Sequence, residues 1–79
     1  MQPDTNDRED ARHDAASAAQ ARADNARERA LAARRAAEHA TTEYTRRSHH
    51  RTADLHAKLA VSHQDFARRV RFGAGREAA

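Results

Sequence analysis

A pattern that repeats every eleven residues runs through the second half of this chain. Its members are separated alternately by four and seven positions, and they are Tyr44, Ser48, Leu55, Leu59, Phe66 and Val70. Eleven residues make about three turns of an α-helix at roughly 3.67 residues per turn, so residues in phase with the repeat lie on one side of the helix. The repeat therefore predicts an all-α fold with an apolar stripe.

The strong helix breakers are confined to the two ends of the chain. The one proline is Pro3, and the two glycines are Gly73 and Gly75. Because nothing between them forces a turn, we expect one long amphipathic helix over about residues 7–72. Its stripe has no cover within the chain, so this helix has to pair with others in a coiled-coil-like assembly.

The expected domain organisation follows from this helix. We expect a disordered N-terminal segment over residues 1–6, a helical association region over 7–72 and a flexible C-terminal tail over 73–79. Within the association region, residues 41–72 carry the repeat, whereas in residues 7–40 the stripe consists mostly of alanine. Alanine buries little area per residue, so the Ala-rich half is expected to be the weaker one.

A cluster of threonine, serine and histidine at residues 41–52 offers an alternative fold. These residues have poor helix propensity, and some of them can compete for backbone hydrogen bonds. A turn near residues 45–52, with Thr52 as the N-cap of a second helix, would give a helical hairpin. The uninterrupted phase of the eleven-residue repeat favours the single helix.

The supply of large apolar side chains is too small for a compact monomeric globule. Of the 30 residues that make up the 38% hydrophobic content, 21 are alanine. Fully burying a larger side chain contributes roughly 1.5 to 3 kcal/mol, so the other nine give on the order of 20 kcal/mol. Ordering a residue costs roughly 1.5 kcal/mol, so stability has to come from helix propensity and association.

We therefore expect a non-enzymatic interaction or structural protein that self-associates, as a homo-oligomer, or binds a partner helix. The predicted interface residues are Tyr44, Ser48, Thr52, Leu55, Leu59, Phe66 and Val70. A fainter line at the same spacing gives a possible second contact edge at Val61 and Phe72. Large buried side chains dominate helix interfaces, so the leucines and the phenylalanine of the main stripe should carry most of the binding.

Basic side chains suggest a second class of partner. The net charge is +3, and a basic helix can lie along phosphates. Sequence-tolerant binding of nucleic acid or another anionic surface is therefore the alternative function. The residues that would carry it are Arg34, Arg35, Arg46, Arg47, Arg51, Arg68, Arg69 and Arg71. A membrane surface is the less favoured target, because the stripe lacks tryptophan and is alanine for half its length.

No arrangement of residues indicates catalysis. The chain has no cysteine, no Gly-rich phosphate loop and no context that would activate a serine. His39 with Glu43 and His50 with Asp54 have helical metal-ligand spacing, but two ligands do not make a site. We expect no enzyme activity, no cofactor and no metal. The absence of a secretory signal pattern or a long apolar run predicts a cytoplasmic location.

Overall fold

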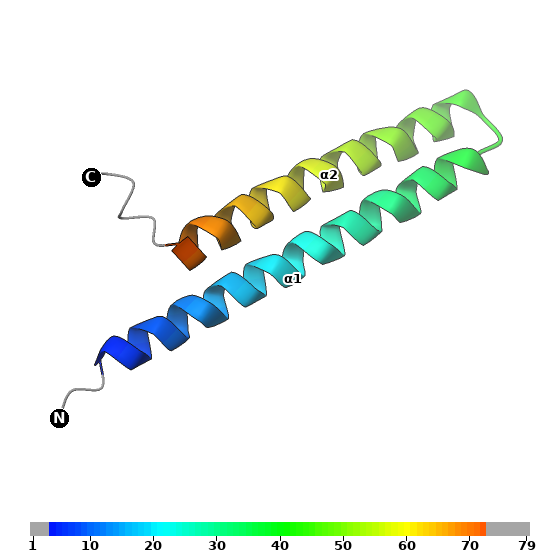
Figure 1. Ribbon diagram of the computed structural model, residues 1–79. Coiled ribbons are helices and arrows are strands. Elements are labelled where there is room, and N and C mark those ends of the chain that lie inside the picture. Colours follow the sequence, from blue (N-terminus) through cyan, green and yellow to red (C-terminus); the bar gives the residue numbers. More distant parts are fainter. Residues whose placement is uncertain (1–3, 73–79) are drawn as a thin grey trace.

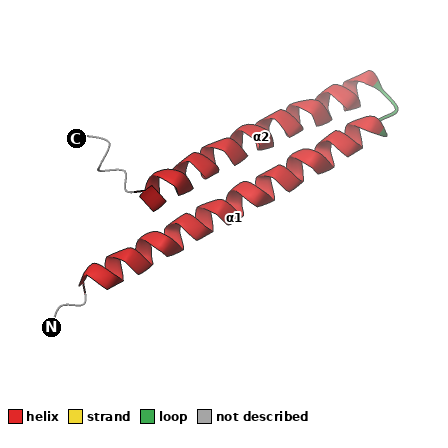
Figure 2. Ribbon diagram, in the orientation of Figure 1, coloured by secondary structure: helices red, strands yellow, loops and turns green. Residues whose placement is uncertain are grey.

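The computed structural model describes residues 4–72, which form two antiparallel helices joined by a short turn (Figures 1 and 2). Helix α1 is Asp4–Glu38 and helix α2 is Glu43–Phe72. The helices run side by side, and the first turns of α1 extend beyond the end of α2 (Figure 1). The radius of gyration is 17.9 Å, well above the value of about 12 Å for a compact domain of this length. The fold is an elongated helical hairpin.

The hairpin agrees with the alternative architecture, and the single helix predicted over residues 7–72 is not confirmed. The turn occupies residues 39–42, so it also precedes the segment 45–52 in which we expected it. Helix α1 begins at Asp4. Residues 1–3 and 73–79, which include the predicted tail, lie outside the described part of the chain.

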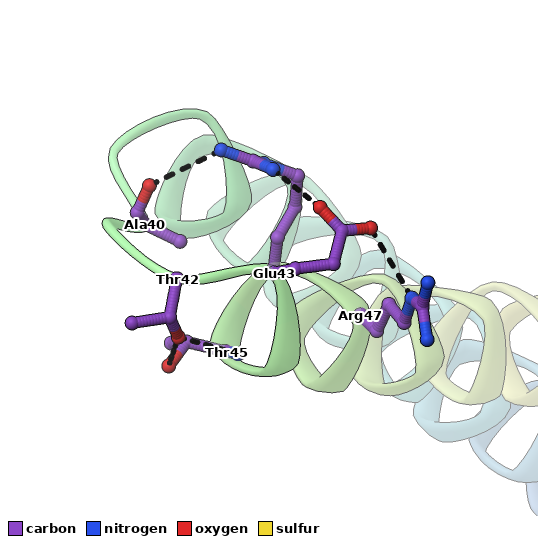
Figure 3. Close-up of polar contacts among 6 residues, drawn as sticks. Ala40, Thr42, Glu43, Thr45 and Arg47 are labelled. Carbon is purple, nitrogen blue, oxygen red and sulfur yellow. Dashed lines mark hydrogen bonds and ion pairs between the residues drawn. The ribbon is translucent and has the colours of Figure 1, made fainter.

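Helix α2 begins after Thr42 because this residue is its N-cap. The Thr42 hydroxyl oxygen accepts a hydrogen bond from the backbone N–H of Thr45 at 3.1 Å (Figure 3). The Thr42 carbonyl accepts the first backbone bond of the helix, from the N–H of Arg46 at 3.0 Å. Threonine is among the residue types that satisfy helix N-terminal donors in this way. Glu43 follows in the first turn, where the helix dipole favours an anion.

The end of α1 is tied to the start of α2 across the turn. The backbone N–H groups of His39 and Ala40 each donate to the carbonyl three residues earlier, at 3.2 Å, which tightens the last turn of α1. The Arg46 guanidinium donates to the Ala40 carbonyl at 3.4 Å and to Glu43 at 2.7 Å (Figure 3). The chain therefore reverses without a glycine, through capping groups on both sides of the turn.

Thr52, which we predicted as an N-cap, lies within α2. Its hydroxyl donates to the Ser48 carbonyl at 3.1 Å, one helical turn earlier. This back-bond satisfies the hydroxyl without breaking the helix. Residues 43–52 are therefore helical despite their poor helix propensity.

Only alanines are buried among the described residues, and none of them is more than 8% exposed. Those of α1 are separated by three and four positions in alternation: Ala16, Ala19, Ala23, Ala26, Ala30, Ala33 and Ala37. Those of α2 are separated by seven: Ala53, Ala60 and Ala67. We call these ten residues the alanine seam. The buried pattern therefore repeats every seven residues, whereas the sequence pattern that we followed repeats every eleven.

The seven-residue step is what keeps the seam closed along the hairpin. The two helices run in opposite directions with the same rise per residue, so equal steps keep the two alanine series facing each other. Methyl groups also let the helix backbones approach closely, which gives dense van der Waals contact. One side-chain hydrogen bond crosses between the helices beside the seam, from the Arg27 guanidinium to Gln64 Oε1.

Burial in this seam contributes little per residue. A buried methyl is worth about 0.8 kcal/mol, so the ten alanines together contribute on the order of 8 kcal/mol. The larger side chains, each worth roughly 1.5 to 3 kcal/mol if buried, are not part of the seam. The hairpin therefore leaves part of its apolar free energy available to a partner.

Enlarging a seam alanine should force the helices apart. We expect Ala30→Leu to lower the free energy of unfolding by about 1 to 3 kcal/mol through overpacking. Ala32→Leu is the matched control, because Ala32 is exposed on the same helix and should change stability by less than about 0.5 kcal/mol. Urea unfolding followed by circular dichroism measures both. Equal effects of the two substitutions would contradict the seam.

The two threonines discriminate between the observed and the expected turn. Thr42→Ala should lower the free energy of unfolding by about 1 kcal/mol, because it removes the N-cap of α2. Thr52→Ala should be close to neutral or slightly stabilising, since alanine has the better helix propensity. The same urea titration measures both variants. A larger loss of stability from Thr52→Ala than from Thr42→Ala would contradict the turn at residues 39–42.

Candidate helix-binding surface

The large apolar side chains of the described residues lie on the outside of the hairpin. They are between 40 and 77% exposed, and they are Leu31, Tyr44, Leu55, Leu59, Val61, Phe66 and Phe72. No large side chain is fully buried in the part of the chain that the structure describes. Their distribution around the two helices therefore decides which surface can take a partner.

One group of these side chains forms a continuous stripe on α2. Leu55, Leu59, Phe66 and Val70 follow one another by four, seven and four positions, and this spacing places them on one side of a helix. Leu59 is 40% exposed, Phe66 46% and Leu55 57%, and Val70 is half-buried. We call these four residues the leucine flank. It is the most extended apolar surface of the hairpin.

The leucine flank borders a hollow between the two helices. From α1, the hollow is lined by Arg22, Asn25, Ala26 and Arg29, and from α2 by His56, Leu59 and His63. The two arginines are seven residues apart, as are the two histidines, so the same chemistry recurs along the hairpin. Both histidines are half-buried, whereas both arginines are exposed. Apolar, imidazole and guanidinium groups therefore adjoin one another here.

A second, smaller apolar group lies on the opposite side. Val61 is two residues after Leu59, which places it about 200° farther around the helix. It lines a different hollow, together with Leu31, Arg27 and Arg34 of α1. Phe72, the other residue of the predicted second edge, is exposed at the end of α2. We call Leu31 and Val61 the opposite flank.

The predicted interface residues are only partly brought together. The members of the leucine flank lie together, and Ser48 and Thr52 precede them on α2, linked by the back-bond. Tyr44, by contrast, is 77% exposed and lies in the first turn of α2, eleven residues before Leu55. It lines a shallow hollow at the surface of α2 with Glu43, Arg47, His50, Arg51 and Asp54. Whether these residues bind a partner stays a prediction.

The arginines predicted to bind polyanions do not form one patch. Near the turn, Arg46 and Arg47 bind Glu43 at 2.7 and 3.2 Å. Arg34 lies beside Val61, and the other predicted arginines are distributed over both helices and toward both ends of the hairpin: Arg35, Arg51, Arg68, Arg69 and Arg71. The predicted arginines therefore occupy two separate regions of the hairpin, one near the turn and one at the end of α2.

The residues that we overlooked are those on the α1 side of the hollow. Arg22 is the one position at which the eleven-residue repeat, carried back from Tyr44 and Ser48 into the first half of the chain, does not meet an alanine. Arg29 follows Arg22 by seven residues. The same step separates His56 and His63 in the second half of the chain. A search for seven-residue steps shared by the two halves would have found both pairs.

The described residues offer no other kind of built site. No three histidine, cysteine, aspartate or glutamate side chains among them are grouped to hold a metal ion. Every buried side-chain nitrogen or oxygen in residues 8–72 has a hydrogen-bond partner. Neither α1 nor α2 is long and apolar enough to cross a membrane.

Comparison of the chain with known protein families, with characterised proteins and with solved structures finds no match. The function therefore has to be inferred from the surface itself.

Proposed function

We propose that this protein is a small, non-enzymatic interaction module that binds an α-helix, of another chain or of a second copy, through the leucine flank. The observation that supports this function is the separation of apolar side chains by size. The hairpin buries only alanine methyl groups, while Leu55, Leu59 and Phe66 are 40 to 57% exposed side by side on α2. Adjacent apolar side chains of this size, exposed on a straight helix, are typical of an interaction surface.

The form of the surface suits a helix better than a small molecule. The leucine flank runs along α2, and the hollow beside it runs between α2 and α1, so the ligand that covers both is long and narrow. A third helix laid along this line presents its own apolar residues at helical spacing. Such packing extends the hairpin into a helical bundle, in which each helix buries one apolar stripe.

The energy available limits the affinity. Covering the exposed 40 to 57% of Leu55, Leu59 and Phe66 contributes roughly 2 to 4 kcal/mol before the cost of association. A dissociation constant of 1 µM requires about 8 kcal/mol in net terms. The three side chains alone therefore give weak binding, and the polar groups that border them have to contribute.

Binding of nucleic acid through the arginines is the less favoured function. The eight predicted arginines are dispersed, and Glu43 already pairs with two of them. A phosphate backbone would also leave the leucine flank uncovered. This alternative remains useful as a control in the experiments below.

The two flanks of α2 provide a matched test. We expect Leu59→Asp to weaken association by about tenfold or more, since it places an unpaired carboxylate in an apolar contact. Val61→Asp puts the same charge on the opposite flank, at a position 59% exposed against 40% for Leu59, and should weaken association less than about threefold.

Two measurements cover both kinds of partner. Sedimentation equilibrium over a concentration series reports self-association, and fluorescence anisotropy reports binding of labelled amphipathic helical peptides. Circular dichroism must show that both variants keep their helicity. If association is absent by both methods, or if Leu59→Asp and Val61→Asp weaken it equally, the leucine flank is not the binding surface.

A further inference from the structure

The charges around the leucine flank indicate which kind of helix binds there. Resting on the proposed function, we infer that the partner is an acidic amphipathic helix, one whose apolar stripe is bordered by aspartate or glutamate. The inference rests on two observations: cations border the flank beside Leu59, and no carboxylate lines the hollow there.

The cations come from α1. Arg22 and Arg29 line the hollow beside Leu59, and their seven-residue spacing keeps them on one side of the helix. Neither guanidinium forms an ion pair with a carboxylate in the described part of the chain. Two exposed guanidinium groups therefore stand at the edge of an apolar surface, with their charge available to a partner.

The carboxylates of α1 between residues 15 and 38 lie away from the leucine flank. Asp24 pairs with Arg27 at 3.0 Å, and Arg27 lines the hollow of the opposite flank. Glu28 lines a hollow on α1 with Leu31 and Arg35. Glu38 follows Leu31 by seven residues and so lies on the same side of α1 as Leu31. None of these carboxylates borders the hollow beside Leu59.

The acids of α2 are placed in the same way. Glu43 pairs with two arginines and lines the hollow of Tyr44, in which Asp54 also lies. Asp54 precedes Val61 by seven residues and Asp65 follows it by four, which places both on the side of the opposite flank. The acids between residues 15 and 72 therefore lie away from Leu55, Leu59 and Phe66. Asp14 precedes Asn25 of the hollow by eleven residues, so it lies on this side of α1, toward the Val70 end of the hairpin.

This segregation disfavours a symmetric pair of copies. A two-fold dimer through the leucine flank sets each flank against itself. Arg22 and Arg29 of both copies would then border one interface, in which no carboxylate adjoins Leu59. An acidic helix instead pairs with these guanidinium groups through charge-assisted hydrogen bonds, and its field speeds the encounter.

The same surface disfavours a nucleic acid. Two arginines displace only about two counterions from a phosphate backbone, which gives weak binding with a shallow dependence on salt. Leu55, Leu59 and Phe66 would gain nothing from phosphates. An acidic amphipathic helix is the partner that uses both the apolar and the cationic groups.

Two synthetic peptides test this inference on the full chain. Both carry the same leucine stripe at helical spacing, and the residues that border the stripe are glutamate in one peptide and lysine in the other. We expect the glutamate peptide to bind about tenfold more tightly at low salt, a difference of about 1.4 kcal/mol. Because the interaction is at an exposed edge, the difference should shrink in about 1 M salt.

Two charge-reversal variants show which arginines cause the preference for the glutamate peptide. The double variant Arg22→Glu, Arg29→Glu should lose the preference for the glutamate peptide or reverse it. The double variant Arg34→Glu, Arg68→Glu changes the net charge equally, at two exposed arginines on the side of the opposite flank, and should keep the preference. Loss of preference in both variants would attribute it to net charge and overturn the inference.

The remaining outcomes separate the inference from the proposed function. Equal binding of both peptides, sensitive to Leu59→Asp, overturns the acidic partner and leaves the helix-binding function intact. If neither peptide binds and the chain does not self-associate, both fail. A dimer that Leu59→Asp abolishes and the glutamate peptide cannot displace would make a second copy the occupant. Tighter binding of duplex DNA or of anionic vesicles than of the glutamate peptide also overturns the inference.

Discussion

Close contact between alanine methyl groups is the interaction on which the rest of this structure depends. The seam gains its energy from the short distance between two helix backbones, since each residue supplies only one methyl group. A larger side chain in the seam would separate the helices and weaken the contacts around it. Leucine, valine and phenylalanine are therefore placed outside the seam, where a partner can reach them. The fold and the proposed binding surface follow from the same restriction on size.

The position of the turn follows from the same seam. With the chain reversed at residues 39–42, the helices have 35 and 30 residues, so most of the alanine series in α1 has a helix to face. A turn at residues 48–52 would leave a second helix of only about twenty residues after Thr52 and a longer uncovered stretch before it. Local signals at Thr42 and Thr52 are similar, because both are threonines with an acid within two positions. Packing along the whole hairpin decides between them.

Several features could be predicted from the sequence because they depend on single residues or on local spacing. The absence of proline and glycine between residues 4 and 72 predicted helix, and the spacing of Leu55, Leu59 and Phe66 predicted that they share one side. The alanine seam was harder to recognise. With 21 alanines in the chain, many spacings find a match, and the eleven-residue phase ran through the turn by such coincidences. Only the burial of particular alanines distinguishes the seven-residue step.

The hairpin itself can be tested by one distance. The chain has no cysteine, so His13→Cys and Arg71→Cys allow a spin label at each of two residues that line the same hollow. In dilute solution, pulsed electron paramagnetic resonance should give a distance within about 20 Å, or two helix diameters. An uninterrupted helix would put the labels roughly 87 Å apart at 1.5 Å per residue. That longer distance, or a short one that disappears when labelled protein is diluted with unlabelled protein, would contradict the alanine-seam hairpin.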